Sequence, residues 1–224
     1  MKQADARFRR ASVHLFTAPV LLFDNPDLAY CEISGTLIFL DIARDRYFCL
    51  SERHNREALA LIDEQGLGRQ HQPGADIKSI AFEAPVRSST AIVTGPFRIA
   101  DTARAIWIQR RVEKRIASWS FHSMLSDLRT VLDTCTVPEF EMGRDAARTI
   151  RAFEYARLLR TAADRCLPRS IALALCLASD GMRANVVVGV RLAPFGAHCW
   201  VQQGGDVLND SVEEVLCYRP ILVI

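Results

Sequence analysis

The stretch from residue 165 to residue 210 constrains the fold most, because it predicts one buried helix followed by two paired strands. Residues 167–178 are apolar on almost every side, which is typical of a buried helix. Residues 183–192 are rich in β-branched side chains, which favour a strand. After a turn at 194–196, residues 197–202 alternate between two faces as a second strand does. A thiol, an imidazole and a carboxylate lie on these elements or at their boundaries.

Cys166 lies at or just before the start of the predicted helix. Unpaired backbone N–H groups and the helix macrodipole favour an anion at that end, and Pro168 suits the first turn. Arg165 and Arg169 flank the cysteine with positive charge. Both influences lower the pKa of a thiol, as a nucleophilic cysteine requires. The alternative is an inert buried thiol, which is the common state of a free cysteine.

His198 and Asp210 are predicted to face each other across a hairpin. Residues 203–205 resemble a three-residue loop with glycine in the left-handed conformation, which would place the two Cβ atoms about 5 Å apart. A slip of one residue would move the carboxylate to the other face of the sheet. Alternatively, the two are an ordinary sheet histidine and a turn residue. With Cys166, the pair supplies the base and the orienting acid that an activated thiolate needs.

These residues resemble the transglutaminase-like cysteine-protease core of the lasso-peptide biosynthesis B proteins, over about residues 145–220. The matching segments are Cys166-Leu167-Pro168-Arg169-Ser170, Gly189-Val190-Arg191, His198-x-Trp200-Val201 and Val207-Leu208-Asn209-Asp210. The resemblance implies a transglutaminase- or papain-like α+β fold, with Cys166 as nucleophile, His198 as base and Asp210 as the residue that orients the base. Cys199 departs from the family, which more often has alanine there; its side chain is expected to face away from His198.

The resemblance also implies a function. Proteins of this family are leader peptidases, which cut a ribosomally made precursor peptide before an asparagine-synthetase-like cyclase closes a macrolactam ring. No cofactor or metal of the protein's own is implied, and ATP enters through the partner cyclase. Two alternatives stay open: a non-catalytic chaperone that binds the precursor, and acyl transfer on the same fold.

The N-terminal part predicts a small winged-helix-like module. Strands are expected at residues 28–34, 36–41 and 47–50, and Ser51 is expected to cap a helix that ends near residue 63. A short helix is also expected near residues 77–82. Residues 1–85 carry 10 Lys and Arg against 12 Asp and Glu, which argues against nucleic-acid binding.

This module resembles the peptide-recognition module of the same B proteins, although the match is looser. Four residues stand in matching places: Leu40, Asp41, Tyr47 and Phe48. The resemblance implies that the precursor's leader peptide adds as a strand against the third strand, so that main-chain hydrogen bonds supply the affinity. The alternative for Tyr47 and Phe48 is ordinary core packing. The predicted domains are residues 1–100 for recognition and 101–224 for the peptidase, with a helical lead-in at 102–135 and 144–163.

Composition points to a cytoplasmic protein. The seven cysteines are an odd set without a CxxC pair, so a structural zinc site and a disulfide framework are not expected. Residues 15–23 follow basic residues but span nine positions and contain Pro19, which does not fit a signal peptide. No segment reaches the roughly 18 to 20 apolar residues of a membrane span, and the net charge is +2. Neither a membrane nor a nucleic-acid partner is therefore expected.

Overall fold

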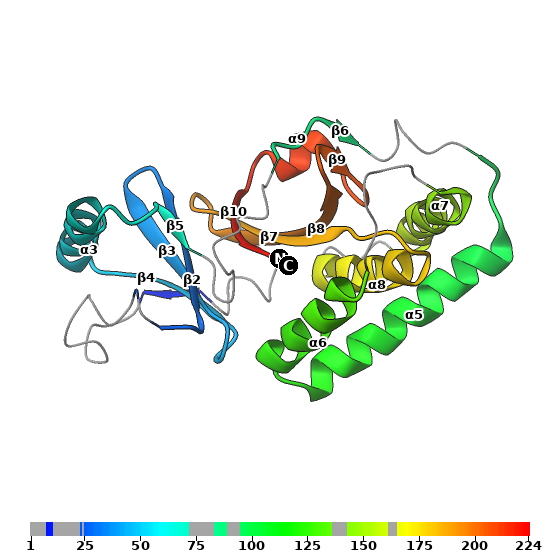
Figure 1. Ribbon diagram of the computed structural model, residues 1–224, viewed down its shortest axis with the longest axis horizontal. Helices are drawn as coiled ribbons and strands as arrows, with labels where there is room; N and C mark the ends of the chain where they lie inside the picture. Colours follow the sequence, from blue (N-terminus) through cyan, green and yellow to red (C-terminus); the bar gives the residue numbers. More distant parts are fainter. Residues whose placement is uncertain are drawn as a thin grey trace.

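The computed structural model describes residues 8–10, 23, 25–71, 83–88, 95–135, 143–160 and 165–224. These residues form a mixed α+β structure with two five-stranded sheets, as predicted for the fold class. The first sheet and helix α3 (Glu52–Gln65) lie at one end of the molecule, and a group of helices lies at the other (Figure 1). The second sheet lies between them. The helix expected near residues 77–82 lies outside the described residues.

The first sheet has the strand order β1-β4-β3-β2-β5. Its strands are β1 (Phe8–Arg10), β2 (Leu28–Ile33), β3 (Thr36–Asp41), β4 (Arg46–Cys49) and β5 (Gln70–His71). The three strands predicted here are confirmed to within one residue, because each combines β-branched or aromatic residues with a turn on either side. Strand β1 pairs with β4 in parallel, a long-range contact that the local sequence pattern did not predict.

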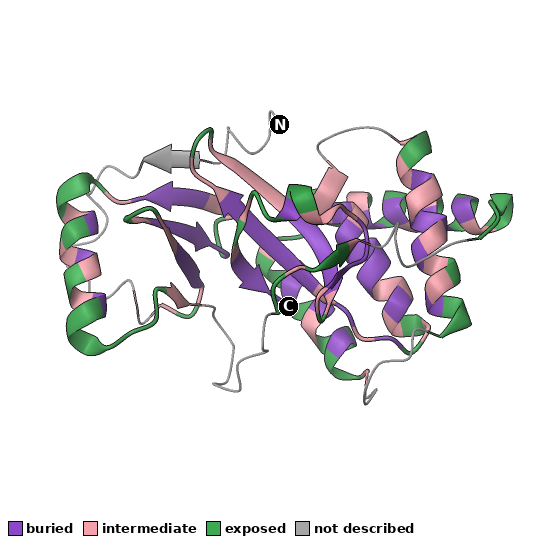
Figure 2. Ribbon diagram, turned by 90° about the horizontal axis from the view of Figure 1, so that it is seen from above, coloured by how far each residue is buried: buried purple, intermediate pink, exposed green. Residues whose placement is uncertain are grey.

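Both faces of the first sheet are buried. One face packs against α3 and carries Leu28, Tyr30, Leu37, Phe39 and Phe48. The alternate residues, Ala29, Cys31, Ile38, Leu40, Tyr47 and Cys49 among them, belong to the main core of the molecule. Helix α3 begins after Ser51, whose hydroxyl accepts from the His54 N–H, as predicted for a capping residue. Its inward side is buried and its outward side is exposed (Figure 2).

The second sheet has the order β10-β7-β8-β9-β6. Its strands are β6 (Arg87–Ser88), β7 (Asn185–Arg191), β8 (Gly196–Gln203), β9 (Asp206–Val207) and β10 (Arg219–Val223). Helix α8 (Cys166–Ser179) packs on one face, against the row that includes Val188, Cys199 and Val201. The short helix α9 (Val212–Val215) contributes Val215 to a smaller cluster with Trp200 on the other face.

The hairpin between β8 and β9 differs from the prediction by one residue. Gln203 pairs with Asp206, so the loop is the two residues Gly204 and Gly205 rather than three. Gly204 has the left-handed conformation, with φ at 52°. Strand β9 ends at Val207, after which the chain bends. Asp210 therefore does not lie opposite His198 on a paired strand; it follows this bend.

The helical lead-in is two helices rather than one. Helix α5 (Ile99–Ser118) ends at Trp119, and α6 (Phe121–Asp133) begins after Ser120, whose hydroxyl accepts from the Ser123 N–H. Trp119 lies at this break, where 44% of it is exposed. Helix α7 (Arg144–Leu159) confirms most of the helix predicted at 144–163; residues 161–164 lie outside the described part.

The two sheets share one core. A continuous cluster of buried apolar side chains runs from the first sheet to α8 and the second sheet. The Gln70 side chain donates to the Pro220 carbonyl at 3.1 Å, and the rings of Tyr47 and Phe195 lie 5.6 Å apart. The N-terminal sheet is therefore fixed against the turn that leads into β8. No helix in the described residues has the length and apolar character to span a membrane.

Candidate active site

Cys166 is the first residue of α8. Arg165 precedes the helix and makes no side-chain cap, so the sulfur stands beside unpaired N–H groups at the positive end of the helix dipole. The helix itself is held rigidly because most of its residues after the first turn are buried. The predicted position of the thiol at a helix N-terminus is thus confirmed.

Asp210 and His198 are in contact despite the shifted hairpin. The distance between His198 Nε2 and Asp210 Oδ2 is 2.8 Å, and the two side chains are 14% and 11% exposed. Asp210 Oδ1 accepts the backbone N–H of Ser211 at 2.9 Å. The Arg169 guanidinium donates to Oδ2 at 3.3 Å. Both carboxylate oxygens are therefore engaged, which fixes the direction in which the acid holds the imidazole.

The thiol of Cys166 is hydrogen-bonded to His198, and the two groups change each other's pKa. Burial raises the pKa of Cys166, but the His198 hydrogen bond and charge, the Cys199 backbone N–H and the Arg169 charge lower it to below its usual value. Burial lowers the pKa of His198, yet the hydrogen bonds to Asp210 and Cys166 and the charges of both raise it to about 9. Both shifts favour a thiolate beside an imidazolium.

The two arginines beside Cys166 differ in what they contact. Arg169 lies one turn into α8 and acts on both Cys166 and Asp210, lowering the pKa of each after burial has raised it. Arg165 Nε lies 3.7 Å from Glu113 on α5, so a carboxylate offsets much of its charge. The predicted effect of Arg169 on the pKa of Cys166 therefore has a structural basis, whereas the ion pair of Arg165 with Glu113 weakens the predicted effect of Arg165.

Three residues to which the sequence assigned no individual role lie around the ring of His198; Gly189 and Trp200 belong to the segments that match the family, and Tyr218 does not. The imidazole packs against Tyr218 at 5.1 Å and Trp200 at 6.2 Å, measured between ring centroids. Gly189 lies opposite His198 on β7, and a Cβ there would come within 2.7 Å of the Trp200 ring and 2.9 Å of Tyr218. A glycine inside a β-branched run is the signal that could have found this close approach.

The four residues predicted to bind a leader peptide lie elsewhere, in the first sheet. The side chains of Leu40, Asp41, Tyr47 and Phe48 are buried, with exposed fractions between 0% and 7%. Asp41 accepts from the backbone and guanidinium of Arg44, at 2.9 and 3.0 Å. These four side chains are therefore part of the core rather than of an exposed surface.

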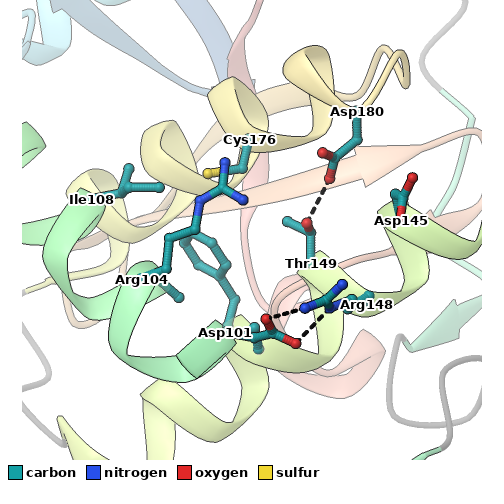
Figure 3. Close-up of a pocket in the computed structure, with 11 residues that line it drawn as sticks. Asp101, Arg104, Ile108, Asp145, Arg148, Thr149, Cys176 and Asp180 are labelled. Carbon is teal, nitrogen blue, oxygen red and sulfur yellow. Dashed lines mark hydrogen bonds and ion pairs between the residues drawn. The ribbon is translucent and has the colours of Figure 1, made fainter. Parts of the chain in front are cut away.

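A polar pocket of about 190 Å³ lies between α5, α7 and α8, away from the Cys166 end of α8 (Figure 3). Its charged groups are largely paired with one another. Arg148 makes two hydrogen bonds to Asp101, and the Thr149 hydroxyl donates to Asp180. Burial raises the pKa of Cys176 at its edge to about 11. Among the described residues, no three His, Cys, Asp or Glu side chains gather as a metal site.

The lowered pKa predicts that Cys166 reacts faster than an ordinary thiol near neutral pH. We expect iodoacetamide to alkylate Cys166 at pH 7 at least about tenfold faster than free N-acetylcysteine, because its pKa lies below the usual value. His198→Ala removes the hydrogen bond and positive charge, so burial dominates and the reaction at pH 7 slows. Mass spectrometry of the Cys166 peptide gives the rate, with Cys176 as the slow internal control. If the alkylation rate of Cys166 is no higher at pH 7 than that of N-acetylcysteine, and rises with pH only as that reference thiol does, the prediction is wrong.

Comparison with known proteins agrees with the arrangement. The transglutaminase-like superfamily matches residues 102–223, more than half of the chain. A stretch of 46 residues is 48% identical to the microcin J25-processing protein McjB of Escherichia coli. This match covers 20% of the chain and spans 22% of that relative. No solved structure gives a significant match. Residues 102–223 include helix α8 and the second sheet's strands from β7 onward, and the chain belongs to the transglutaminase-like superfamily.

Proposed function

We propose that this protein is a cysteine peptidase that removes the leader from a ribosomally made lasso-peptide precursor. The observation that carries the proposal is the contact of a helix-terminal thiol with an imidazole that a partly buried carboxylate holds at 2.8 Å. Membership of the transglutaminase-like superfamily and the partial similarity to a microcin J25-processing protein support it. An asparagine-synthetase-like cyclase that uses ATP is the proposed partner, and it acts on the released core peptide.

In the proposed reaction the Cys166 thiolate attacks the scissile carbonyl of the precursor. The first-turn N–H groups of α8 face the developing oxyanion and stabilise it. The His198 imidazolium gives its proton to the leaving amine, which leaves the leader as a thioester on Cys166. The neutral imidazole then takes a proton from water as the water oxygen attacks the thioester, and the Cys166 thiolate leaves, which restores its pair with the His198 imidazolium and frees the leader as an acid. Asp210 keeps the ring oriented and stabilises its charged form in both halves of the reaction.

Acyl transfer remains the second candidate because it shares this thioester. The superfamily is compatible with either outcome, since an amine that replaces water in the second half yields an amide instead of an acid. The mass of the product distinguishes the two. The chaperone alternative makes no use of a lowered thiol pKa at Cys166.

We expect the purified protein to release the leader from the precursor encoded beside it, when the cyclase and ATP are present. Cys166→Ala abolishes release, because the nucleophile is gone. Asp210→Asn slows it by about a hundredfold or more, because a neutral amide no longer stabilises the imidazolium. Mass spectrometry of the peptides gives the rates and shows whether water or an amine was added.

Cys217→Ser is the matched control, because Cys217 is an exposed thiol outside the site, and it should cleave normally. Normal release by Cys166→Ala eliminates the thiol mechanism. Binding of the precursor without release, under every combination of partners, would instead support the chaperone.

The winged-helix-like recognition module is part of the proposal, and its leader-binding edge is β4. The chain's own strand β1 pairs with that edge in parallel, with Phe8 opposite Tyr47 and Arg10 opposite Cys49. A sheet edge offers one row of N–H and C=O groups, so one strand at a time can use it. A leader that adds to β4 therefore takes the place of β1.

Removing β1 should strengthen leader binding. A variant that lacks residues 1–10 no longer spends part of its time with the edge filled, so its apparent affinity for a labelled leader peptide rises by about threefold to tenfold. Fluorescence anisotropy measures the affinity, and a peptide of residues 1–12 added in trans should compete. Equal or weaker binding by the shortened variant argues against leader addition at β4.

A further inference from the structure

Two buried polar side chains connect the three segments that carry the candidate triad. Ser170 and Asn209 are 0% and 1% exposed, in parts of the core that are otherwise apolar. Ser170 lies four residues after Cys166 on α8, and Asn209 immediately precedes Asp210. Buried polar groups are costly unless they are bonded, so their partners show what they hold together.

Ser170 and Cys166 both bond to the backbone of Cys199 on β8. The Ser170 hydroxyl donates to the carbonyl of Cys199 at 2.9 Å, while the backbone N–H of Cys199 donates to the sulfur of Cys166. Residues four apart on a helix lie on one face, so a single turn of α8 bonds to both the N–H and the C=O of Cys199. These two bonds fix the position of β8 along the helix. His198 immediately precedes Cys199, so its position relative to Cys166 is fixed as well.

Asn209 completes the connection to the acid. Its Nδ2 donates to the Ser170 hydroxyl at 2.9 Å, and its Oδ1 accepts the backbone N–H of Val201 at 2.8 Å. The Leu208 N–H donates to the Val201 carbonyl at 2.8 Å. The Asn209 side chain therefore replaces a backbone bond of the hairpin at the point where the chain bends away. This bond fixes the position of the next residue, Asp210, which contacts His198 although it is not part of a strand.

We propose that Ser170 and Asn209 are positioning residues, which set the distances among Cys166, His198 and Asp210 through this buried chain of hydrogen bonds. The proposal rests on the role proposed for Cys166 as nucleophile, and it adds residues that touch neither substrate nor the reacting atoms. Each link joins two of the three segments, so the loss of either side chain frees one triad member to move. A shift of about 1 Å costs an active site on the order of a hundredfold in rate.

The test is Cys166 alkylation by iodoacetamide in folded protein, because this reaction needs no peptide substrate. We expect Ser170→Ala and Asn209→Ala each to raise the pH at which Cys166 becomes reactive and to slow its reaction at pH 7 by about tenfold. Ser170→Ala removes a single oxygen and suits a helix, so it is the variant expected to fold most readily. The double variant should react no more slowly than the slower single variant, because both break one chain.

Asn55→Ala is the matched control. Asn55 is a buried amide on α3 that also accepts a backbone N–H, from Leu37 at 2.8 Å, and donates to a carbonyl, that of Gly35 at 2.7 Å. This variant should lose stability comparably, measured by thermal unfolding, while Cys166 reacts at the wild-type rate. The proposal is overturned if folded Ser170→Ala reacts at the wild-type rate, or if Asn55→Ala slows Cys166 equally. Either outcome is independent of whether a leader is cleaved.

Discussion

The hydrogen bond between His198 and Asp210 is the interaction on which the site depends. Burial alone raises the pKa of Cys166 and lowers that of His198, so each charged form is unfavourable by itself. The hydrogen bond and charge of Asp210 outweigh the effect of burial on the pKa of His198. The resulting imidazolium in turn outweighs the effect of burial on the pKa of Cys166. The three groups therefore ionise as a set. Removing one partner would leave a partly buried charge uncompensated, and the carboxylate also bonds to Ser211 and Arg169.

The rest of the fold keeps that bond in place. Helix α8 brings the sulfur to the edge of the second sheet, and the sheet's other face packs Tyr218 and Trp200 against the imidazole. The N-terminal sheet also contributes, because Tyr47 packs on Phe195 in the turn just before β8. Through the shared apolar core, Tyr47 thus connects β4, where the leader is proposed to bind, with the turn that precedes the strand carrying His198.

Elements with strong local signals were predictable from the sequence. The apolar run of α8, the β-branched run of β7 and the Ser51 cap of α3 each fix their own structure, and all three are confirmed. The contact of His198 with Asp210 was predicted for the wrong reason. The loop has two residues, and the side chain of Asn209 replaces a ladder bond, which no periodic pattern encodes. The pairing of β1 with β4 and the bond from Asn209 to Ser170 join distant residues, so local reasoning could not find them.

The most direct test of the central claim is the titration of the His198 ring by nuclear magnetic resonance in substrate-free protein. We expect an imidazolium at pH 7 that loses its proton at a pKa of about 9, and a lower pKa in Cys166→Ala because a hydrogen bond and a negative charge are gone. A His198 that titrates near the ordinary value of about 6.5, and does so equally in Cys166→Ala, would contradict the coupled site.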